Sequence, residues 1–335
     1  MTVRARDVAL AAQVSVSTVS RALARPHQVA PDTLEKVLAT ARVLGYRPNP
    51  FARSLTTGRT GNLGMVVPDL ENPFFASVAK GVQSRARAAG CATFVADSEE
   101  DADQESELVR TLSKQVDGIL LCSPRAHASV LAELALECNL VLVNRRCGDI
   151  PAVAVDNHEG MRQAYSHLRA LGHRRVAYVG GPTRSWSNDQ RLAALRTLTA
   201  AHPDTELLDL GCFAPYVSGG VAAGDLVVAS GATAVVAFND MVALGLLARL
   251  VSRGCRVPGD ISVVGVDDIV VSSLTNPPLT TVRLPVAESG RAGVDLLLSI
   301  VQQRAAPPPP LLLETHLVVR GSTGPHGGPG ARSPT

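Results

Sequence analysis

The chain has 335 residues, of which 46% are hydrophobic and 19% charged, and a formal net charge of +2. Because domains usually contain about 100–200 residues, this predicts a globular protein of two or three folding units. No apolar run reaches the roughly 20 residues of a membrane-spanning helix, and the start MTVRARDVAL lacks a signal peptide's apolar stretch, so we expect a cytoplasmic protein with no membrane partner.

The charge is unevenly distributed. Residues 1–60 contain nine Lys and Arg residues against three Asp and Glu residues, a net charge of +6, whereas the remaining residues total −4. A compact basic segment on a mildly acidic body favours a polyanion as the partner of the first 60 residues. On charge alone, a merely solvated basic surface is the alternative.

Three short helices are expected in residues 4–45. The first covers residues 7–12, the second 17–24, and the third begins at Pro31, where the missing N–H of proline costs nothing. The third helix has apolar residues at the spacing of one helical face and stops at Gly45. Residues 46–60, rich in Pro, Arg, Thr and Gly, form a linker that contains a helix-capable run at 50–55.

From residue 61, apolar runs of β-forming residues alternate with helical stretches. This alternation occurs in two series and predicts parallel sheets covered by helices on both faces. The expected strands are 63–67, 92–96, 118–122 and 141–143 in the first series, and 176–179, 207–210, 234–238 and 262–266 in the second.

The predicted fold is therefore a small all-α domain joined to an α/β core of two doubly wound parallel-sheet lobes. We expect a small basic helical domain at 1–47, a linker at 48–60 and a core at 61–321. Its first lobe would comprise 61–157 and 284–310, and its second lobe 158–283 and 311–321. The Gly, Pro and Ser content of 322–335 predicts a disordered tail.

No motif for a cofactor or a metal is found. No GxGxxG follows a strand and no Walker loop is present. The six cysteines form no CxxC pair and no zinc-like spacing with histidine, so they are expected to be free thiols. We expect no cofactor and no bound metal.

Residues 8–21 have the layout of a helix-turn-helix. Small residues in the first helix let two helices approach closely, and Ser15 and Ser17 suit the start of the second, where a hydroxyl can cap free N–H groups or reach a phosphate. Val16, Ser17 and Arg21 are free to face the major groove, where Val16 can touch a thymine methyl and Arg21 can pair with guanine. A small helical core without DNA contacts is the alternative.

Ordered motifs then point to a family. VSVSTVSRAL, LGYRPNPFARSL and GMVVPDLENPFF, followed by HLRALGHRRVAYVGG, VAFNDMVALG and DISVVGVDDIVVSSLTNPPLTTV, resemble the lactose/galactose repressor family (LacI–GalR) over residues 3–321. The resemblance implies a transcription regulator, a repressor, that binds palindromic operator DNA as a homodimer and so associates with the nucleoid. Its core is similar to periplasmic sugar-binding proteins.

The resemblance also assigns DNA contacts by position. It makes Val16, Ser17 and Arg21 base readers, and Ser15, Thr18, Ser20 and Asn49 phosphate or positioning contacts. It places a hinge helix at 50–55, including Ala52, with Leu55 as the wedge that enters the minor groove. Two departures from the family concern the helical domain. Gln13 stands where glycine is usual in the turn, and Ala30 stands where serine often caps the third helix.

The family's ligand site lies between the lobes, at the carboxyl ends of parallel strands. The matching positions here supply aromatic faces and groups that pair with hydroxyls. The expected effector contacts are Phe74, Phe75, Asn144, Arg145, Arg191, Asn239, Asp267 and Arg283, with Asp69 and Trp186 as further candidates. A sugar or polyol is the favoured effector, and a purine or another polar metabolite acting as corepressor is the alternative.

Structural alternatives exist for these residues. Phe74 and Phe75 could be ordinary core, Asp240 is expected to cap the following helix, and Trp186, in a polar loop, could pack there or stack on a ligand. An enzyme is disfavoured, since the SxxK match at Ser77–Lys80 lies in a predicted helix without partner motifs, and His158, His167 and His173 are expected at the surface. A sugar-binding protein without a DNA role is disfavoured by the basic segment.

Overall fold

The computed structural model describes residues 3–24, 26–46, 59–302 and 310–327. The chain divides into two compact units, residues 1–61 and 62–335, which are considered separately. In the described ranges no helix is both long and apolar enough to span a membrane. The hinge residues Asn49, Ala52 and Leu55 lie outside those ranges.

The first unit is a three-helix bundle. It contains α1 (Ala5–Ala11), α2 (Val16–Ala24), the 3₁₀ turn η1 (Pro26–Gln28) and α3 (Pro31–Val43). Small side chains allow close packing at its centre, because Ala9, Ala12 and Ala22 are buried beside Val8, Val19 and Val37. The burial of Val19 and Ala22 fixes which face of α2 points inward, and it leaves the opposite face of α2 free.

The turn between α1 and α2 has a left-handed backbone at Gln13, with φ 53°. The Gln13 N–H donates to Leu10 O at 3.2 Å and the Val14 N–H to Ala9 O at 3.0 Å, the pattern of a Schellman motif, in which glycine is usual. Gln13 therefore occupies a left-handed position that glycine adopts without steric cost. Ala30 stands at the N-cap of α3 and makes no side-chain capping bond.

Replacing Gln13 by glycine should stabilise this unit by about 1 kcal/mol, because glycine adopts positive φ without steric cost. In the full chain, amide hydrogen exchange at Val8 and Val19 should slow by about fivefold. Gln13→Ala retains a Cβ atom and serves as the control. Equal protection in the two variants would contradict a left-handed strain at this residue.

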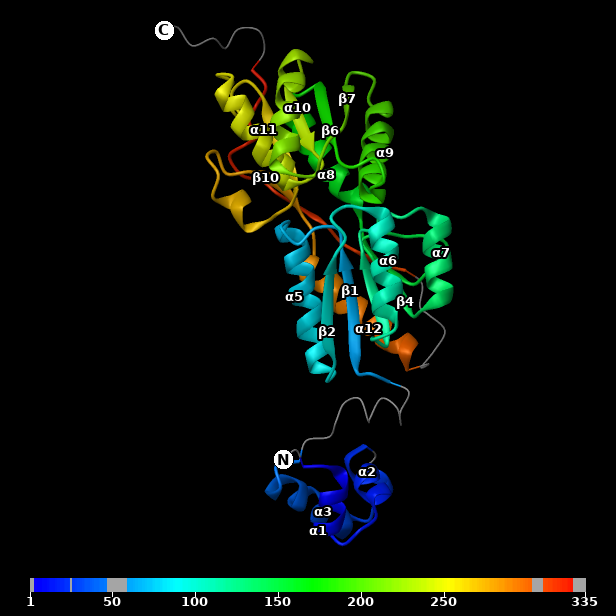
Figure 1. The fold of residues 1–335 in the computed structure, drawn as a ribbon. Helices are drawn as coiled ribbons and strands as arrows, with labels where there is room; N and C mark the ends of the chain where they lie inside the picture. The colour runs from blue at the N-terminus through cyan, green and yellow to red at the C-terminus, as the bar shows by residue number, and fades with distance from the viewer. Residues whose placement is uncertain (1–2, 25, 47–58, 303–309, 328–335) are drawn as a thin grey trace. The chain divides into compact units, whose positions relative to one another are not determined.

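The second unit contains two six-stranded sheets, one in each lobe (Figure 1). The first sheet has the order β11-β5-β4-β3-β1-β2. Helices α5 and α12 pack together over one face of this sheet, and α6 and α7 lie together on the other. The elements are β1 (Asn62–Val67), α5 (Pro73–Ala88), β2 (Ala92–Asp97), α6 (Ala102–Ser113), β3 (Gly118–Cys122), α7 (Ala128–Glu137), β4 (Leu140–Val143), β5 (Ala152–Val155), α12 (Val286–Val301) and β11 (Leu311–Leu313).

The second sheet has the order β12-β10-β9-β8-β6-β7, and its strands are parallel except for β12. Helices α8 and α9 pack as one pair and α10 and α11 as another. The elements are α8 (Asn157–Ala170), β6 (Arg175–Gly180), α9 (Trp186–Ala200), β7 (Glu206–Cys212), α10 (Val217–Ala229), β8 (Ala234–Ala237), α11 (Asp240–Ser252), β9 (Ser262–Asp267), η2 (Val270–Ser273), β10 (Thr280–Arg283) and β12 (His316–Val318).

The assignment of residues 311–321 to the second lobe is wrong at its start. Leu311–Leu313 pair in parallel with Val153–Val155 of β5, so β11 extends the first sheet, and only β12 joins the second. The apolar sequence of β11 gave no sign of which sheet edge it would meet, since both edges are open to a short strand.

The expectation of a disordered tail from residue 322 is also wrong for residues 322–327. Val263 donates its N–H to Ser322 O at 2.8 Å, and the His326 N–H donates to Leu171 O at 2.8 Å. His173, expected at the surface, is buried below this segment. Its Nδ1 lies 2.9 Å from the Thr233 hydroxyl and its Nε2 3.1 Å from Gly324 O.

This buried histidine should make stability depend on pH. Burial lowers the pKa of His173 to about 4, whereas an exposed histidine titrates near 6.5. The free energy of unfolding should be undiminished above pH 6.5 and fall as the pH drops from 6.5 towards 4, by up to about 1.4 kcal/mol per pH unit. Urea unfolding of wild type and His173→Gln should show this slope only in the wild type, and equal slopes would contradict the assignment.

Candidate functional site

The outer face of α2 is open to a partner. Val16 is 46% exposed, and Ser17, Ser20 and Arg21 are exposed as well. The Arg21 Nε makes only a long contact, 3.4 Å, with Ser17 O. The helix therefore presents a methyl-bearing side chain, two hydroxyls and a guanidinium on one side, which is a set suited to base edges in the major groove.

Ser15 stands immediately before α2 and caps it. Its hydroxyl oxygen accepts the Thr18 N–H at 3.0 Å and lies 2.7 Å from the Ser17 hydroxyl and 2.8 Å from that of Thr18. The capping function is thus seen directly. Contacts of Ser15, Thr18 and Ser20 with phosphate remain predictions.

A narrow cleft lies in the second unit at the carboxyl ends of strands from both sheets. Six of the expected effector residues line it together, namely Phe74, Phe75, Asn144, Arg191, Asn239 and Asp267. The cavity between the side chains is about 30 Å³, room for about two water molecules at roughly 10–15 Å³ each. A ligand of sugar size therefore requires the lobes to part or the lining side chains to move.

Backbone strain is concentrated at these strand ends. Of the seven described non-glycine residues with positive φ, six follow or end a strand beside the cleft: Glu99, Glu100, Ser123, Asn144, Asp267 and Asp268. Such conformations cost roughly 1–3 kcal/mol each and persist where the surrounding structure imposes them. Because such strain clusters at ligand sites, these strand ends are the candidate functional site of the second unit.

Arg191 is buried and hydrogen-bonded to two other residues. Its Nε donates to Asn157 Oδ1 at 2.9 Å, its Nη1 donates to Phe238 O, and its guanidinium lies 5.1 Å from the centre of the Phe238 ring. Burial raises the pKa of the Asp267 carboxyl well above its usual range, and the charge of Arg191 opposes this rise. Both side chains line the cleft and interact electrostatically.

Two asparagines face the cleft from different lobes. Asn144 Nδ2 donates to the Ser123 hydroxyl at 2.9 Å, while its Oδ1 is buried without a partner in the described structure. Asn239 Oδ1 accepts the Val242 N–H at 2.9 Å, so Asn239 caps α11 as well as lining the cleft. The expectation that Asp240 is the cap is therefore wrong.

The phenylalanine pair belongs to the core and also lines the cleft. Phe74 and Phe75 are buried, with ring centres 5.0 Å apart in an edge-to-face arrangement, and both belong to the main hydrophobic cluster. They also line the cleft. Asn72 positions them by accepting the Phe74 N–H at 3.0 Å and so capping α5.

Four candidate residues do not line this cleft. Arg145 Nη1 donates to the carbonyls of Pro124 and Ala126, and together with Trp186 it lines a neighbouring cavity of about 370 Å³. Trp186 is the first residue of α9 rather than part of a loop. Arg283 is exposed and pairs with Asp268 at 2.6 Å, and Asp69, although buried, is absent from the lining.

The cleft also contains charged residues that the sequence reasoning missed. Glu100 and Arg125 form an ion pair at 2.5 Å, with side chains 16% and 5% exposed, and both line the cleft. Their position in the sequence could have predicted Arg125 as a lining residue. Residues 123–125 follow β3 as Asn144 follows β4, and the carboxyl ends of neighbouring parallel strands meet at one edge.

Nothing in the described part of the chain suggests catalysis by the SxxK match. Ser77 lies within α5 and donates its hydroxyl to Pro73 O at 3.0 Å, while Lys80 is exposed. No group of three or more His, Cys, Asp or Glu residues in the described ranges could hold a metal ion.

Comparison with known proteins gives concordant matches in both units. Residues 5–49 match a family model described as bacterial regulatory proteins, lacI family, and residues 165–323 match a periplasmic binding protein-like domain. The chain is 32% identical to the HTH-type transcriptional repressor CytR of Escherichia coli over 328 residues, 95% of each protein.

Solved structures of two regulators have a similar fold. A Lac repressor dimer bound to operator and the anti-inducer ONPF has a TM-score of 0.84 and 29% identity, covering 97% of this chain and 100% of that one. A complex of the regulator CelR with cellobiose has a TM-score of 0.70 and 31% identity, covering 96% and 99%. These proteins are regulators rather than enzymes.

Proposed function

The chain belongs to the lacI family of bacterial regulatory proteins, and from this premise we propose that it represses transcription of a carbohydrate-utilisation operon. A homodimer binds a palindromic operator in the cytoplasm, on the nucleoid, and a sugar or polyol bound between the lobes releases it. The observation that carries the proposal is the exposed face of α2 in a chain whose other unit has a strained, polar cleft.

The DNA contacts rest on the geometry of the first unit. Its buried core holds α2 so that Val16, Ser17 and Arg21 face outward, the arrangement in which a recognition helix reads base edges. Ser15, Thr18, Ser20 and Asn49 are proposed to contact the phosphate backbone. Ala52 and Leu55 are proposed to enter the minor groove from a hinge helix, where Leu55 kinks the operator.

The effector assignment rests on the chemistry of the cleft. Aromatic rings of Phe74 and Phe75 beside amide and carboxylate groups suit the C–H faces and hydroxyls of a sugar, and the similar CelR structure contains cellobiose. Arg145, Trp186, Asp69 and Arg283 are not proposed as primary contacts in this conformation. A purine acting as corepressor is the second candidate, since the aromatic pair would equally accept a base.

The dimer proposal is supported by an exposed apolar turn. In η2, Val270 and Val271 are 78% and 45% exposed, and Leu274, which follows, is exposed too. A contiguous apolar patch of this kind marks an interaction surface, and the similar Lac repressor structure is a dimer. A homodimer also matches a palindromic operator, because each protomer reads one half-site.

Regulation requires that the effector bind one conformation better than the other. Opening or closing of the cleft moves the two lobes relative to each other, and this motion would change the spacing of the paired hinges at residues 48–60. We propose induction: a sugar must rearrange the narrow cleft to enter it, and this rearrangement lowers the affinity for the operator. A corepressor would instead raise that affinity.

The test combines operator selection with ligand titration. Random DNA is selected on the full chain, and binding to the recovered sequence is compared with that of residues 62–335. A palindromic consensus that the truncated chain does not bind supports the proposal. A thermal-shift panel of sugars and purines then identifies ligands. The effect of each ligand on operator retention shows whether it acts as an inducer or as a corepressor. Selection without any consensus would contradict a sequence-specific regulator.

A further inference from the structure

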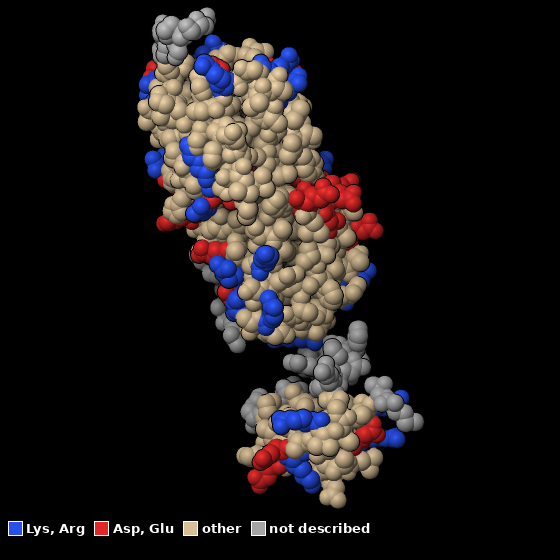
Figure 2. Space-filling model, turned by 90° about the vertical axis from the view of Figure 1, so that its left-hand side faces the viewer, with Lys and Arg blue, Asp and Glu red and all other residues tan. Residues whose placement is uncertain are grey.

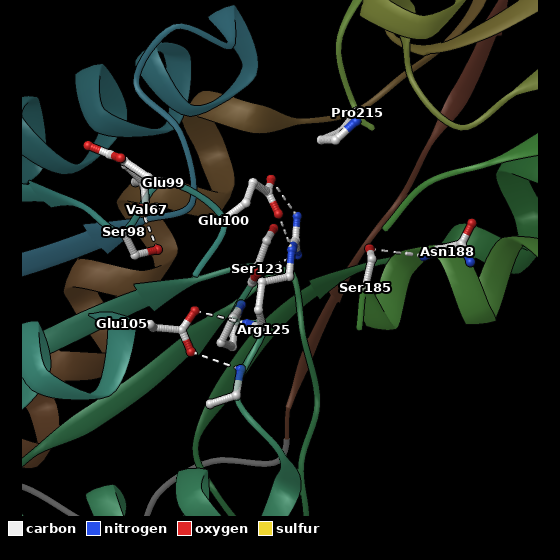
Figure 3. A network of polar contacts seen from close by, with 12 residues as sticks. Val67, Ser98, Glu99, Glu100, Glu105, Ser123, Arg125, Ser185, Asn188 and Pro215 are labelled. Atoms are coloured by element: carbon white, nitrogen blue, oxygen red, sulfur yellow. Dashed lines mark hydrogen bonds and ion pairs between the residues drawn. The ribbon is translucent and has the colours of Figure 1, made fainter. Parts of the chain in front are cut away.

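The Arg125 guanidinium in the cleft is neutralised by a partner within the chain. All three nitrogens of the Arg125 guanidinium donate hydrogen bonds, Nε and Nη2 to the Glu100 carboxylate at 2.5 and 3.0 Å and Nη1 to Ser123 O at 2.6 Å. Figure 3 shows the carboxylate of Glu100 turned onto this guanidinium. Three of the five N–H groups of Arg125 are thus occupied, and its positive charge faces the carboxylate of Glu100.

The second arginine of the cleft is similarly occupied. Arg191 donates to Asn157 and Phe238, and the carboxylate of Asp267 interacts with its charge. Of the two arginines of the cleft, Arg125 is therefore neutralised by an ion pair with Glu100, and Arg191 is hydrogen-bonded to protein acceptors with Asp267 as a nearby carboxyl. An anion entering the cleft would add an uncompensated negative charge in a poorly solvated site.

Among the described residues that line the cleft, the buried polar atom without a partner is an acceptor. Asn144 is 7% exposed, and its Oδ1 is buried without a hydrogen bond among the described residues. Buried acceptors of this kind are satisfied by O–H or N–H groups of a ligand and repelled by its oxyanions.

The position of Glu100 is imposed by the fold. Glu99 and Glu100 have φ values of 50° and 62°, and the Glu100 N–H donates to Pro68 O at 2.8 Å. Opposite, the carboxylate of Glu105 accepts the N–H groups of Arg125 and Ala126 at 2.8 and 3.1 Å (Figure 3). Two strained residues and a buried carboxylate thus hold the ion pair in place.

Most residues near Glu100 in the sequence are acidic, like Glu100 itself. Seven of the eleven residues at 97–107 are Asp or Glu, and Figure 2 shows acidic side chains gathered in a dense patch on one face of the two-lobed unit. An acidic surface lowers the local concentration of anions and raises that of neutral ligands relative to them.

We propose that the Glu100–Arg125 pair makes the cleft selective for uncharged, hydroxyl-rich ligands, such as a free sugar or a nucleoside, against their phosphorylated forms. This inference rests on the proposed function of the cleft as the effector site. A phosphate group bound at Arg125 would lie beside the Glu100 carboxylate, a like charge held on the same guanidinium. Exclusion of the wrong ligand by a fixed charge is a source of specificity distinct from attraction of the right one.

The experiment compares matched ligands on the full-length protein by isothermal titration calorimetry. The probes are glucose and glucose 6-phosphate, ribose and ribose 5-phosphate, adenosine and AMP, and inorganic phosphate. In wild type, each phosphorylated probe should bind at least tenfold more weakly than any neutral partner that binds, and phosphate should not bind. Glu100→Gln retains the size of the side chain and frees the charge of Arg125, so at least one phosphorylated probe or phosphate should gain tenfold or more.

Glu99→Gln is the matched control. It removes the same charge from the adjacent residue, whose exposed side chain points away from Arg125 in Figure 3. Three outcomes would each overturn the inference. The first is an equal gain in anion affinity in Glu99→Gln and Glu100→Gln, and the second is tighter wild-type binding of a phosphorylated probe than of its neutral counterpart. The third is no gain in affinity for any anion in Glu100→Gln. A neutral ligand that binds without altering operator retention would instead contradict the proposed function and leave the selectivity intact.

Discussion

Replacing Asp240 by alanine should lower the free energy of unfolding of the two-lobed unit by about 4 kcal/mol or more. Asp240 is fully buried at the start of α11. Its carboxylate accepts the Ile269 N–H at 3.0 Å and the hydroxyls of Ser272 and Thr281 at 2.5 and 2.6 Å. Hydrogen bonds to a charged group contribute roughly 1.5–3 kcal/mol each, and alanine leaves all three donors buried and unpaired.

The loss should extend to ligand binding, because this network joins α11 to η2 and β10, the elements that flank Asp267. Urea unfolding followed by circular dichroism measures the stability of the variant. Asp225→Ala is the control, since Asp225 is 42% exposed and pairs with Arg249 and Arg253 at the surface, where such pairs contribute about 0–1 kcal/mol. Equal losses in the two variants would contradict a stabilising role of the buried network.

The sequence predicted the two sheets and the position of the cleft because both depend on short-range patterns. Continuous apolar runs identify buried parallel strands, and the carboxyl ends of such strands meet at one edge. Polar residues directly after these runs were therefore placed together correctly at Asn144, Asn239 and Asp267. Helix boundaries in the first unit were close, since Pro31 and Gly45 mark them locally.

The direction of individual side chains was not predictable in this way. At φ 61°, Asn144 turns the chain, so its amide faces the cleft while the adjacent Arg145 bonds carbonyls beside the other cavity. Arg283 lies in register with Asp267 on the neighbouring strand, yet its side chain pairs with Asp268 outside the cleft. Positive φ at a strand end breaks the alternation on which such assignments depend.

Long-range polar contacts were the other source of error. Glu100 and Arg125 are separated by 25 residues, and charged residues in a loop predict solvation unless their partner is known. The same reason explains the ordered segment at 322–327, whose composition predicts disorder. Its stability comes from backbone partners such as Val263 and Leu171, which composition does not encode.

Replacing Arg21 by alanine should abolish most of the sequence specificity of operator binding. Arg21 is exposed on the outer face of α2 without an acidic partner in the described structure, so its guanidinium is free to pair with a guanine. A bidentate contact contributes about 1–3 kcal/mol, and a dimer loses two, so affinity for the selected operator should fall by roughly 30-fold or more. Binding to random DNA, which depends on phosphate contacts, should change far less.

Arg42→Ala provides the charge-matched control. Arg42 is an exposed arginine of α3 in the same unit, and its loss removes the same charge without altering the face of α2.

Fluorescence anisotropy with the selected operator and with random DNA, at several salt concentrations, separates base contacts from phosphate contacts. A lost phosphate contact lowers the salt slope for both DNAs. Since a base contact specifies one position, Arg21→Ala should also relax the selected consensus at a single base pair of each half-site. An unchanged consensus with equal losses on both DNAs would show that Arg21 binds phosphate, and the reading of bases would then rest on Val16 and Ser17.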